Sequence, residues 1–567
     1  MQKKWNIRKH DADAVNRLAD ELGVVPIVAA LLISRGHDTV EKAQAFLNPS
    51  PEHLHDPYLL TDMDKAVARI QQAVATCEKI MIWGDYDVDG TTGTVLLRRT
   101  LRLLGSDCTF HIPNRFSEGY GINIPALDEA KNNGVSLVIS VDCGTTSVAE
   151  VAHANSIGLD VIITDHHLPK TGSELPPAVA IVNPNQPDDN YPEKTLAGVG
   201  VAFKLAHALL REAGREEEIT QFLQIAALGT VADIMDLTGE NRAIVALGLI
   251  DLAKTDNWGL KALMEVSDCR SDMTSMHIGF RLGPRINAAG RMDVAMHVVE
   301  LFEAVDFATA RKLAALLDSR NRERQKIQQE ITELALFETE SHDGKHFIVV
   351  AGESWHKGVI GLAASRIADK LYRPTIVLSI DDEDIAHGSA RSIPGFHLLE
   401  ALESAPELMH RFGGHAAAAG MAMPRENIEE LRERLNRLAA DKLTDDDLIP
   451  TLDIDALITP ETLSLGLVES LAAFEPFGKG NPKPIFVTRG LKLLDDPFVM
   501  KEKHLKLKLG AQNGRTFEAV WWDGVAKSSG QTLREGTGIE LAYVAEANKW
   551  NGNTRLQLVV EDLRADN

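Results

Sequence analysis

The sequence has few of the features that mark secreted, membrane-bound or disulfide-stabilised proteins. Its 567 residues include four cysteines, which are far apart and form no CxxC pair. Neither a disulfide framework nor a structural zinc site is therefore expected. No apolar run is long enough to span a bilayer, and the N-terminus becomes polar at once, without the apolar core of a signal peptide. We expect a cytoplasmic protein with no membrane partner.

Positive charge is also scarce. Lysine and arginine together number 59 against 82 aspartates and glutamates, which gives a net charge of −23. This balance argues only weakly against a nucleic-acid partner, because a basic channel can lie within an acidic exterior. Carboxylates that bind metal ions also make the formal charge more negative than that of the metal-loaded protein. The length predicts three or four domains, and the composition is that of an ordinary globular protein.

What the sequence does contain is a set of acidic turns that follow apolar runs. The first is the turn Gly84–Gly90, in which Asp85, Asp87 and Asp89 follow the strand-like run Lys79–Trp83. Unpaired anions at this density repel one another, and a divalent cation is the simplest remedy, because hard cations take carboxylate oxygens. The alternative is a solvated acidic turn that binds no metal.

Two further apolar runs end in a similar way. Leu137–Val141 is followed by Asp142, and Leu159–Thr164 is followed by the triplet Asp165–His167. In this part of the chain strand-like runs alternate with helical patterns, which is typical of an α/β domain with a parallel sheet. Ligands of such sheets bind beyond the carboxyl ends of the strands, so we expect these turns to converge at one edge.

A fourth turn could reach the same edge. Asp233 follows the helical stretch Gln221–Leu228, although the alternative is that Asp233 or Asp236 caps the following helix. The candidate metal ligands are thus Asp87, Asp89, Asp142, His166 and Asp233. So many carboxylates with one imidazole suit Mn²⁺ or Mg²⁺ better than zinc. Two such ions, about 3.5–4 Å apart, can hold the attacking and leaving oxygens of a phosphoryl group and lower the pKa of a water.

The second half of the chain begins with a long helical pattern. Asp306–Glu340 contains no glycine or proline and reads as one connecting helix. Its basic middle, Arg320–Lys326, either faces solvent or touches a phosphate backbone. A second α/β unit follows, with strands expected at His346–Ala351 and Pro374–Ile380.

Three glycine-rich stretches also carry cations. They are Arg281–Asp293, Gly388–Ser392 and Arg411–Gly420. Such turns can present backbone N–H groups and positive charge to phosphate oxygens. The first has a plain loop as its alternative, and the third has tight helix packing around a hydrogen-bonded histidine.

The pattern becomes β-rich after the acidic break Asp441–Asp447. About five strands are expected, one of them the strictly alternating Leu505–Leu509, and this number fits a small barrel such as an OB-fold. Aromatic residues lie close by in the sequence: Trp521, Trp522, Tyr543 and Trp550. Alternating lysines with nearby aromatics suit single-stranded nucleic acid, whereas the alternative is an ordinary strand whose lysines face solvent.

In order and type, these motifs resemble those of the DHH phosphoesterase superfamily. The matching stretches are Asp87–Gly90, Val141–Gly144, Asp165–His167, the Asp233 turn, Arg285–Arg291 and, for the associated DHHA1 domain, Gly413–His415. With the OB-like end, the chain from about residue 60 to 567 resembles the RecJ branch, bacterial 5′→3′ exonucleases specific for single-stranded DNA. The resemblance implies two α/β domains, DHH and DHHA1, joined by a long helix and followed by an OB-like β-barrel.

This resemblance also implies domain boundaries. We expect a helical lead-in at 1–60, the DHH catalytic domain at 61–305, the connecting helix at 306–340, the DHHA1 substrate-binding domain at 341–445 and the OB-like domain at 446–567.

The resemblance implies a ligand set for two ions. Asp89, Asp142, His166 and Asp233 would hold one Mn²⁺ or Mg²⁺, and Asp87 with the shared Asp142 would hold the second, with Asp85 near it. Pyrophosphatase relatives carry a histidine where this chain has Trp83, so the second site must be completed differently, for which Asp85 is the candidate. His167 would contact the scissile phosphate, and Asp165 would orient the histidine pair.

Substrate contacts are implied as well. Recognition of the 5′-terminal phosphate falls to Arg115, Tyr120, Ser389 and Arg391, and contact with the DNA backbone to Arg285, Asn287, Arg291 and His415. Arginine pairs with phosphate through two hydrogen bonds, and tyrosine stacks on bases. The branch further implies mononucleotide products, a passage too narrow for duplex, a monomer, a partnership with single-stranded-DNA-binding protein, and work in DNA repair and recombination.

Two other functions are alternatives. A DHH phosphodiesterase acting on short oligoribonucleotides, cyclic dinucleotides or polyphosphate is generally shorter and lacks the OB-like end. A non-catalytic scaffold that binds single strands has lost metal ligands, whereas here every expected position carries Asp or His, apart from Trp83. The sequence therefore favours an active, metal-dependent exodeoxyribonuclease.

Overall fold

The fold is that of a computed structural model, which describes residues 3–115, 117–170, 172, 174–269, 272–292, 295–340, 346–550 and 552–565. The chain divides into two compact units. Unit A consists of Thr39–Arg322 together with Ala473–Lys483, and unit B consists of Met1–Asp38, Glu323–Ala472 and Pro484–Asn567.

Unit A contains a five-stranded sheet with the order β3-β2-β4-β5-β6, in which every pairing is parallel. Its strands are β2 (Lys79–Gly84), β3 (Cys108–His111), β4 (Val135–Val141), β5 (Asp160–Thr164) and β6 (Ala180–Val182). The predicted parallel sheet and its three predicted strands are confirmed. Strands β3 and β6 were not predicted, because runs of three or four residues are too short to stand out by pattern.

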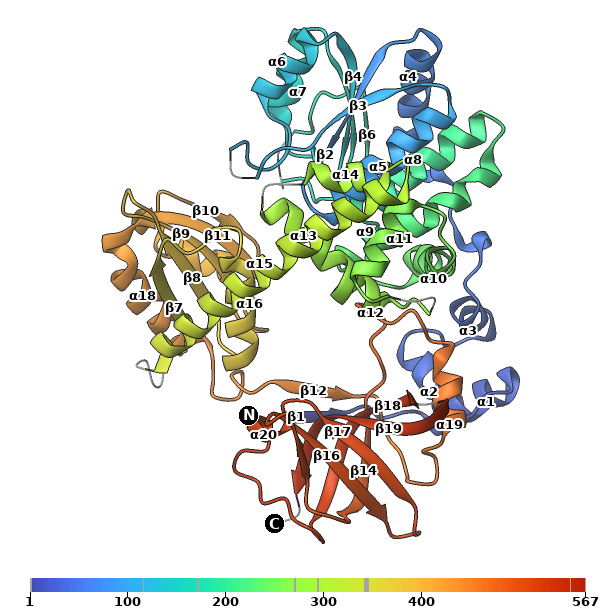
Figure 1. Ribbon diagram of the computed structural model, residues 1–567, viewed down its shortest axis with the longest axis vertical. Coiled ribbons are helices and arrows are strands. Elements are labelled where there is room, and N and C mark those ends of the chain that lie inside the picture. The colour runs from blue at the N-terminus through green and yellow to red at the C-terminus, as the bar shows by residue number, and fades with distance from the viewer. Residues whose placement is uncertain are drawn as a thin grey trace. The chain divides into compact units, whose positions relative to one another are not determined.

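Helices cover both faces of this sheet (Figure 1). Along β2 the side chains alternate, so that Ile80 and Ile82 join one apolar core while Trp83 joins the other. The helices that pack with the sheet are α4 (Met63–Ala75), α5 (Val88–Leu103), α6 (Ile124–Asn132), α7 (Val148–Ser156) and α8 (Gly198–Glu212). A sheet buried on both faces needs near-continuous apolar strands, which is what the sequence supplies.

A second group of helices completes unit A. It comprises α3 (Val40–Leu47), the short turns η1 (Pro51–His53), η2 (Pro57–Leu59) and η3 (Glu216–Phe222), and α9 (Leu223–Ala232), α10 (Gly239–Ala253), α11 (Trp258–Val266), α12 (Ser275–His277), the π-helical turn η4 (Ile278–Leu282), α13 (Gly283–Arg291) and α14 (Met296–Phe302). The loop alternative for the stretch from Arg281 is therefore wrong over its described part. Pro284 lies in the first turn of α13, where its missing N–H costs nothing.

The predicted long helix is confirmed as α15 (Phe307–Glu340). Its first half contributes Ala314 and Leu317 to the main core of unit A, and its second half contributes Ile331 and Ala335 to a core of unit B.

Unit B has a second α/β sheet, with the order β10-β11-β9-β8-β7. Its elements are β7 (Ile348–Glu353), α16 (Ile360–Leu371), β8 (Thr375–Ile380), β9 (Ile385–Arg391), α17 (Leu398–Glu403), η5 (Pro406–Leu408), β10 (Arg411–Gly414), β11 (Ala418–Pro424), η6 (Arg425–Asn427) and α18 (Ile428–Lys442). The pairing of β10 with β11 is antiparallel, so the helical alternative for the stretch after Arg411 is wrong. Small residues permit this hairpin, since a Cβ on Gly414 would lie 2.3 Å from the carbonyl oxygen of Ala418.

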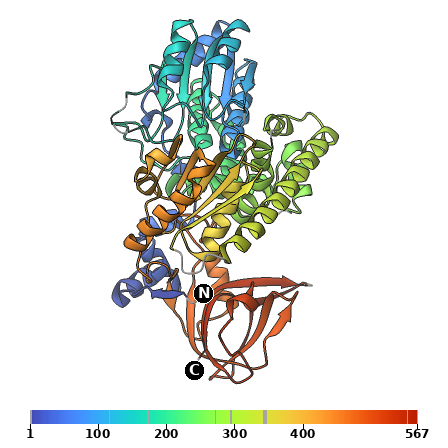
Figure 2. The ribbon, with the colours of Figure 1, turned by 90° about the vertical axis from the view of Figure 1, so that its left-hand side faces the viewer.

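The C-terminal part of unit B forms the predicted barrel (Figure 2). The sheet order is β13-β14-β18-β19-β17-β16-β15, and a further pairing of β14 with β16 closes it. Its elements are β13 (Ala456–Leu457), α19 (Leu465–Ala472), β14 (Phe486–Leu493), β15 (Phe498–Met500), β16 (His504–Ala511), β17 (Thr516–Trp521), α20 (Gly524–Lys527), β18 (Gly538–Trp550) and β19 (Asn553–Ala565).

The aromatic residues of the barrel differ in burial. Trp521 and Tyr543 are buried and fill the barrel, while Trp522 is half exposed. The side chain of Trp550 lies outside the described residues. Lys506 forms an ion pair with Glu518 at 3.0 Å, as does its strand neighbour Lys508 with Asp495 at 3.4 Å.

The N-terminal segment has helices as predicted, α1 (Ala12–Leu22) and α2 (Pro26–Ser34), and also a strand that was not predicted. This strand, β1 (Lys4–Ile7), pairs in parallel with β12 (Thr451–Ile454). No helix in the described part of the chain is long and apolar enough to cross a membrane.

A fully buried ion pair links two helices of unit A. The ammonium of Lys204, on α8, lies 2.7 Å from the carboxylate of Glu240, on α10. That carboxylate also accepts a hydrogen bond from the Tyr191 hydroxyl at 2.6 Å and from the His55 backbone N–H at 3.0 Å. Every partner of the buried charge comes from a different segment, so the pair fixes their packing.

Replacing Glu240 by alanine should strongly destabilise the protein. The buried Lys204 ammonium would lose its counter-charge, at a cost of about 3–5 kcal/mol. The melting temperature, measured by calorimetry, should fall by several degrees. Glu265→Ala is the matched control, because Glu265 pairs with Arg311 in solvent, with side chains 47% and 66% exposed, and such pairs contribute about 0–1 kcal/mol. Equal melting temperatures for the two variants would contradict this interpretation.

Candidate metal centre

The acidic turn after β2 is held in a tight conformation by the start of α5. Asp87 is the N-cap of this helix, and its Oδ1 accepts a hydrogen bond from the Gly90 N–H at 3.1 Å. A Cβ on Gly90 would lie 2.4 Å from the backbone nitrogen of Asp85, so only glycine permits this approach. Local capping chemistry and one glycine thus place Asp85 and Asp87 at the carboxyl end of β2.

Asp89 is oriented by a different helix. Its carboxylate is buried and accepts hydrogen bonds from the N–H groups of Gly198, at 2.6 Å, and Val199, at 2.7 Å. Both donors lie at the start of α8, where helical N–H groups have no partner within the helix. The positive end of the helix dipole therefore stabilises a carboxylate at the sheet edge.

Asp142 lies directly beyond β4, with φ of +63°. Its backbone N–H donates to the carbonyl of Thr164 at 2.9 Å, which continues the β4–β5 pairing. Gly198 approaches so closely that a Cβ there would lie 2.6 Å from the Cβ of Asp142. The start of α8 thus holds both Asp89 and Asp142.

The histidine pair follows β5 and is organised by Asp165. The Asp165 carboxylate accepts hydrogen bonds from the backbone N–H groups of His166 (2.7 Å), His167 (3.1 Å) and Thr145 (2.9 Å). It also lies 2.7 Å from Nδ1 of His167. One buried carboxylate therefore sets the backbone of both histidines and the ring of the second.

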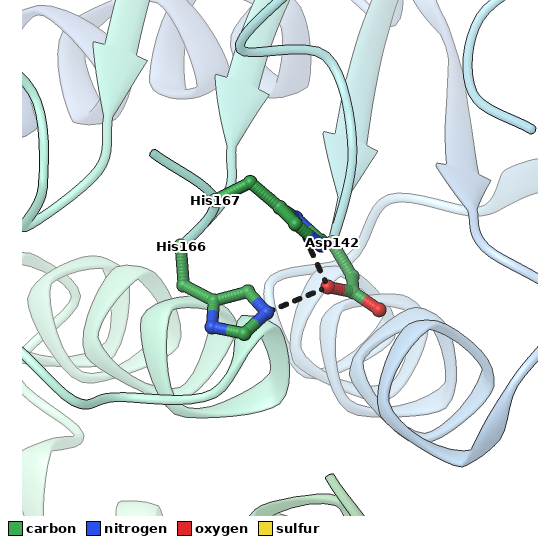
Figure 3. A group of neighbouring side chains, drawn as sticks. All are labelled: Asp142, His166 and His167. Carbon is green, nitrogen blue, oxygen red and sulfur yellow. Dashed lines mark ion pairs between the residues drawn. The ribbon is translucent and has the colours of Figure 1, made fainter. Parts of the chain in front are cut away.

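Both histidine rings point toward Asp142 (Figure 3). Nε2 of His166 lies 3.1 Å from Asp142 Oδ1, and Nδ1 of His167 lies 3.8 Å from the same oxygen. Nε2 of His166 also lies 3.5 Å from Asp233 Oδ2 and 3.8 Å from Asp89 Oδ2. Three carboxylates from different segments therefore surround one imidazole nitrogen.

The structure brings all six predicted metal ligands together. Three groups have ligand atoms within 4.8 Å of one another: Asp89 with His166 and Asp233, Asp85 with Asp87 and Asp142, and Asp142 with His166 and His167. Asp142 occurs in two of these groups, which is the position expected of a shared ligand. Asp233 ends α9, and the following helix begins at Gly239, so the N-cap alternative for Asp233 is wrong.

The oxygens of this cluster fit a divalent cation. Among the described residues, buried oxygens of Asp85 (Oδ1), Asp142 (Oδ1) and Asp233 (Oδ2) have no hydrogen-bond partner. A buried carboxylate oxygen without a donor is destabilising unless a cation neutralises it. A donor set of carboxylates with one imidazole suits Mn²⁺ or Mg²⁺.

The pKa values of these carboxyl groups also support a cation site. Burial raises the pKa of Asp85 to about 8, and the nearby Asp87 charge acts in the same direction. Burial and Asp87 likewise raise the pKa of Asp233 to about 7. The pKa values of Asp89 and Asp142 lie well above the usual range, because both are buried and carboxylates repel one another. A bound cation reverses this effect by favouring the ionised forms.

The two histidines have pKa values shifted in opposite directions. Burial lowers the pKa of His166 to about 4, so this ring is neutral and can act as a ligand. Burial also opposes protonation of His167, but the hydrogen bond and charge of Asp165 outweigh it and raise the pKa of His167. Asp165 is buried too, and hydrogen bonds from His167 and Thr145 nevertheless hold its pKa below the usual range.

Trp83 does not contribute a ligand. Its ring is fully buried and packs against His111, with ring centroids 4.4 Å apart. Asp85, two residues further on, supplies the carboxylate nearest to this end of β2.

Residues missed by sequence reasoning support the histidine pair. The Asn183 amide donates to Thr145 Oγ1 and to the carbonyl of His167, both at 2.9 Å. The Asn185 amide donates to the carbonyl of His166 at 2.7 Å. Both asparagines follow β6, so their signal was a polar Asn-Pro-Asn directly after a short apolar run.

Two residues predicted to bind the 5′ end lie beside this cluster. The Tyr120 hydroxyl donates to the carbonyl of Asp142 at 3.1 Å and lies 3.4 Å from Nδ1 of His167. The Arg115 guanidinium lies 5.0 Å from the ring centroid of Tyr86. An aromatic and cationic surface thus borders the carboxylates.

The predicted backbone-binding residues of α13 have partners within unit A. Asn287 Oδ1 accepts a hydrogen bond from the Val88 N–H at 3.2 Å, which anchors the start of α5. The Arg285 guanidinium is paired with Asp318 at 2.9 Å. Arg291 ends the helix, and its charge acts on Tyr86. Contact of these three with DNA stays a prediction.

The remaining predicted residues lie in unit B. Arg391 donates to Ser389 Oγ at 3.2 Å. A Cβ on Gly361, in the first turn of α16, would lie 2.9 Å from that oxygen and 3.3 Å from Arg391 Nη2. This Ser–Arg pair thus lies against a helix N-terminus, where anions bind favourably. His415 lies in the exposed turn between β10 and β11. Their roles in substrate binding stay predictions.

Comparison with known families matches most of the chain. Residues 79–230 match the DHH family, N-terminal domain, residues 344–441 match the DHHA1 domain, and residues 454–562 match the RecJ OB domain. These are the two α/β regions and the barrel described above.

Similar proteins extend over nearly the whole chain. The single-stranded-DNA-specific exonuclease RecJ of Bacillus subtilis is 42% identical over 99% of this chain and 70% of its own length. RecJ of Escherichia coli is 34% identical over 99% of this chain and 100% of its own length. The crystal structure of RecJ from Thermus thermophilus in complex with Mn²⁺ superimposes with a TM-score of 0.84 and 30% identity, covering 100% of this chain and 80% of that one. The chain belongs to the RecJ family.

Proposed function

We propose that this protein is a single-strand-specific 5′→3′ exodeoxyribonuclease that hydrolyses phosphodiester bonds with two divalent ions and releases 5′-mononucleotides. The observation that carries the proposal is that five carboxylates and His166 form two neighbouring groups of possible metal ligands. Asp142 belongs to one group and lies 3.1 Å from His166 of the other. The relatives named as single-stranded-DNA-specific exonucleases support the substrate class.

The residues divide between the two ions. Asp89, His166 and Asp233, with Asp142, would hold one, and Asp85, Asp87 and Asp142 would hold the other. When bound, Mn²⁺ or Mg²⁺ would supply Lewis-acid stabilisation of phosphoryl charge and a nucleophile near neutral pH.

His167 has the properties of a phosphate contact. Asp165 holds its Nδ1 at 2.7 Å and raises its pKa against the effect of burial, which favours the protonated ring. Its side chain is 48% exposed and can reach a bound strand. A charged imidazole at this place donates a hydrogen bond to a phosphate oxygen and stabilises charge that develops there.

Recognition of the strand end uses aromatic and cationic groups. Tyr120 is half exposed, and its hydroxyl is fixed by Asp142, so its ring is a pre-oriented surface for a base. Arg115 lies next to it over Tyr86 and supplies positive charge for a terminal phosphate. In unit B, Ser389 and Arg391 of β9 lie beside the start of α16 and offer a second set of phosphate donors.

Finer aspects of the proposal rest on the family. The protein would act as a cytoplasmic monomer in DNA repair and recombination, on strands delivered by single-stranded-DNA-binding protein. Its domains would lie at 61–305 (DHH), 341–445 (DHHA1) and 446–567 (OB-like), with the helix 306–340 between the first two and the lead-in 1–60 before them.

The direct test is an end-label assay. With Mn²⁺ or Mg²⁺, the protein should shorten single-stranded DNA from its 5′ end and release 5′-mononucleotides, because terminal phosphate contacts position that end. Strands labelled at the 5′ or the 3′ end are compared, together with a blunt duplex as control. Equal attack on the duplex, or earlier loss of the 3′ label, would overturn the proposed function.

Substitution of Asp142 by asparagine should abolish turnover. The change removes the charge shared by both ion groups, and loss of such transition-state stabilisation lowers the rate on the order of 1,000-fold. Asp256→Asn is the control, because Asp256 is fully exposed and pairs with Lys261 at the surface. Single-turnover rates decide the question, and an Asp142→Asn rate equal to that of the control would contradict the two-ion assignment.

Metal removal should make stability depend on pH in a defined direction. The folded pKa values of about 8 for Asp85 and about 7 for Asp233 lie above the unfolded value of 3.8. The metal-free fold binds these protons more tightly, so stability is lost as pH rises through 7 and 8. The chelated protein should therefore melt at a lower temperature at pH 8.5 than at pH 6.5.

Two comparisons make this measurement specific. Mn²⁺ should raise the melting temperature more at pH 8.5 than at pH 6.5, because a cation stabilises the ionised carboxylates. Asp85→Asn should show a smaller loss of stability between these pH values without metal. A chelated wild-type protein that is equally stable at both would refute the assignment of raised carboxyl pKa values.

A further inference from the structure

The metal ligand Asp233 lies on a turn with a strained backbone. The next residue, Ile234, has φ of +58°, although it is β-branched, and its side chain is 65% exposed. A β-branched residue in the left-handed region is strained and persists only where neighbouring structure holds it. Something must therefore stabilise residues 233–238 in this conformation.

The segment Ala473–Lys483 lies directly on this turn. It belongs to unit A by its contacts, although the chain continues from both of its ends into unit B, to α19 and β14. The carbonyl of Lys479 accepts a hydrogen bond from the Leu237 N–H at 2.8 Å, and the Lys479 ammonium lies 3.5 Å from Asp236. We call this segment the clasp.

Glycines allow the clasp to approach the turn. A Cβ on Gly478 would lie 2.6 Å from the Leu237 side chain. Gly480 has φ of +73°, and a Cβ there would lie 3.1 Å from the Cβ of Asp236 and 3.3 Å from Thr238. Any larger side chain at Gly480 therefore pushes on the turn itself.

The clasp is in turn anchored to a buried arginine. Arg242, on α10, donates hydrogen bonds to the carbonyls of Phe474 at 2.9 Å, Glu475 at 2.8 Å and Ala473 at 3.2 Å, and its guanidinium lies 3.8 Å from the Phe46 ring centroid. The buried Asn481 amide donates back to the carbonyls of Phe474 and Pro476 at 2.7 and 2.9 Å. The clasp is thus a preformed loop held by helix α10.

A second contact ties the clasp to α12, the short helix that leads into η4. The hydroxyl of Ser275 donates to the carbonyl of Phe477. The following turn, η4, packs on α9. A Cβ on Gly279 of this turn would lie 3.8 Å from a methyl group of Val231 on α9. The end of α9 is therefore bounded by the clasp and by η4.

From these contacts we propose that the clasp is a positioning element for the metal centre: it holds the strained turn so that Asp233 faces His166 and Asp89. The proposal rests on the proposed function, because Asp233 acts as a ligand in the two-ion site. The clasp lies in the sequence between α19 and β14, so a segment next to barrel strands contributes to the site through Gly480 and the main chain of Lys479. Residues that orient a metal ligand typically change metal affinity or activity 10–100-fold when altered.

The test compares Gly480→Val with Gly214→Val. Gly214 has φ of +68°, lies in the same unit and has no atom within 4 Å of its Cβ position, so both variants carry the same backbone strain but only one pushes on the turn. Mn²⁺ binding to the full-length protein is measured by electron paramagnetic resonance. Gly480→Val should bind one of two ions 10–100-fold more weakly, and Gly214→Val should match the wild type.

Hydrogen exchange provides a second readout. The Leu237 amide should exchange faster in Gly480→Val than in Gly214→Val, because its hydrogen bond to Lys479 is lost. If the valine variant does not fold, the pair Gly480→Ala and Gly214→Ala gives the same comparison with a milder change. Equal Mn²⁺ affinities and equal exchange in the two members of a pair would overturn the proposal.

Asp233→Asn separates failure of this proposal from failure of the metal site. If Asp233→Asn weakens one Mn²⁺ but Gly480→Val does not, the clasp has no positioning role and the metal site stands. If Asp233→Asn binds both ions like the wild type, the assignment of Asp233 is wrong, and the clasp proposal falls with it.

Discussion

Repulsion among buried carboxylates is the constraint on which the rest of this structure depends. Asp85, Asp89 and Asp142 are almost fully removed from solvent, and Asp87 and Asp233 lie beside them. Desolvation and mutual charge raise the pKa values of four of the five. A fold that places such groups together must hold them by forces strong enough to oppose this cost, and a divalent cation removes most of it.

The opposing forces come from the sheet and the helix ends around it. Strands β2, β4 and β5 are adjacent and parallel, and apolar cores on both faces fix their register. The acidic turns are then stabilised by backbone N–H groups, from the start of α8 for Asp89 and from the start of α5 for Asp87. Asp87 and Asp89 therefore have backbone partners that orient them before any ion is bound.

Several polar residues support the site indirectly, through hydrogen bonds to the residues that form it. Asp165 bonds the backbone of both histidines and one ring, and Asn183 and Asn185 hold the carbonyls of the same pair. Asn287 anchors the first turn of α5. The clasp adds a contribution from a distant part of the sequence, because Lys479 and Gly480 bear on the turn that carries Asp233.

The sequence by itself determined the parallel sheet, the connecting helix, the barrel and most of the residues that cluster at the candidate metal centre. These follow from local signals: apolar runs that must be buried, acidic turns directly after them, and the rule that the carboxyl ends of parallel strands share one edge. Only the tertiary structure decided the rest. Strands β1, β3 and β6 are too short for their pattern to be recognised, and Trp521 and Tyr543 became core residues because barrel closure buries them. Whether Arg285 is paired with Asp318, and whether the clasp lies on the Asp233 turn, depends on contacts between residues far apart in the chain, which no local pattern encodes.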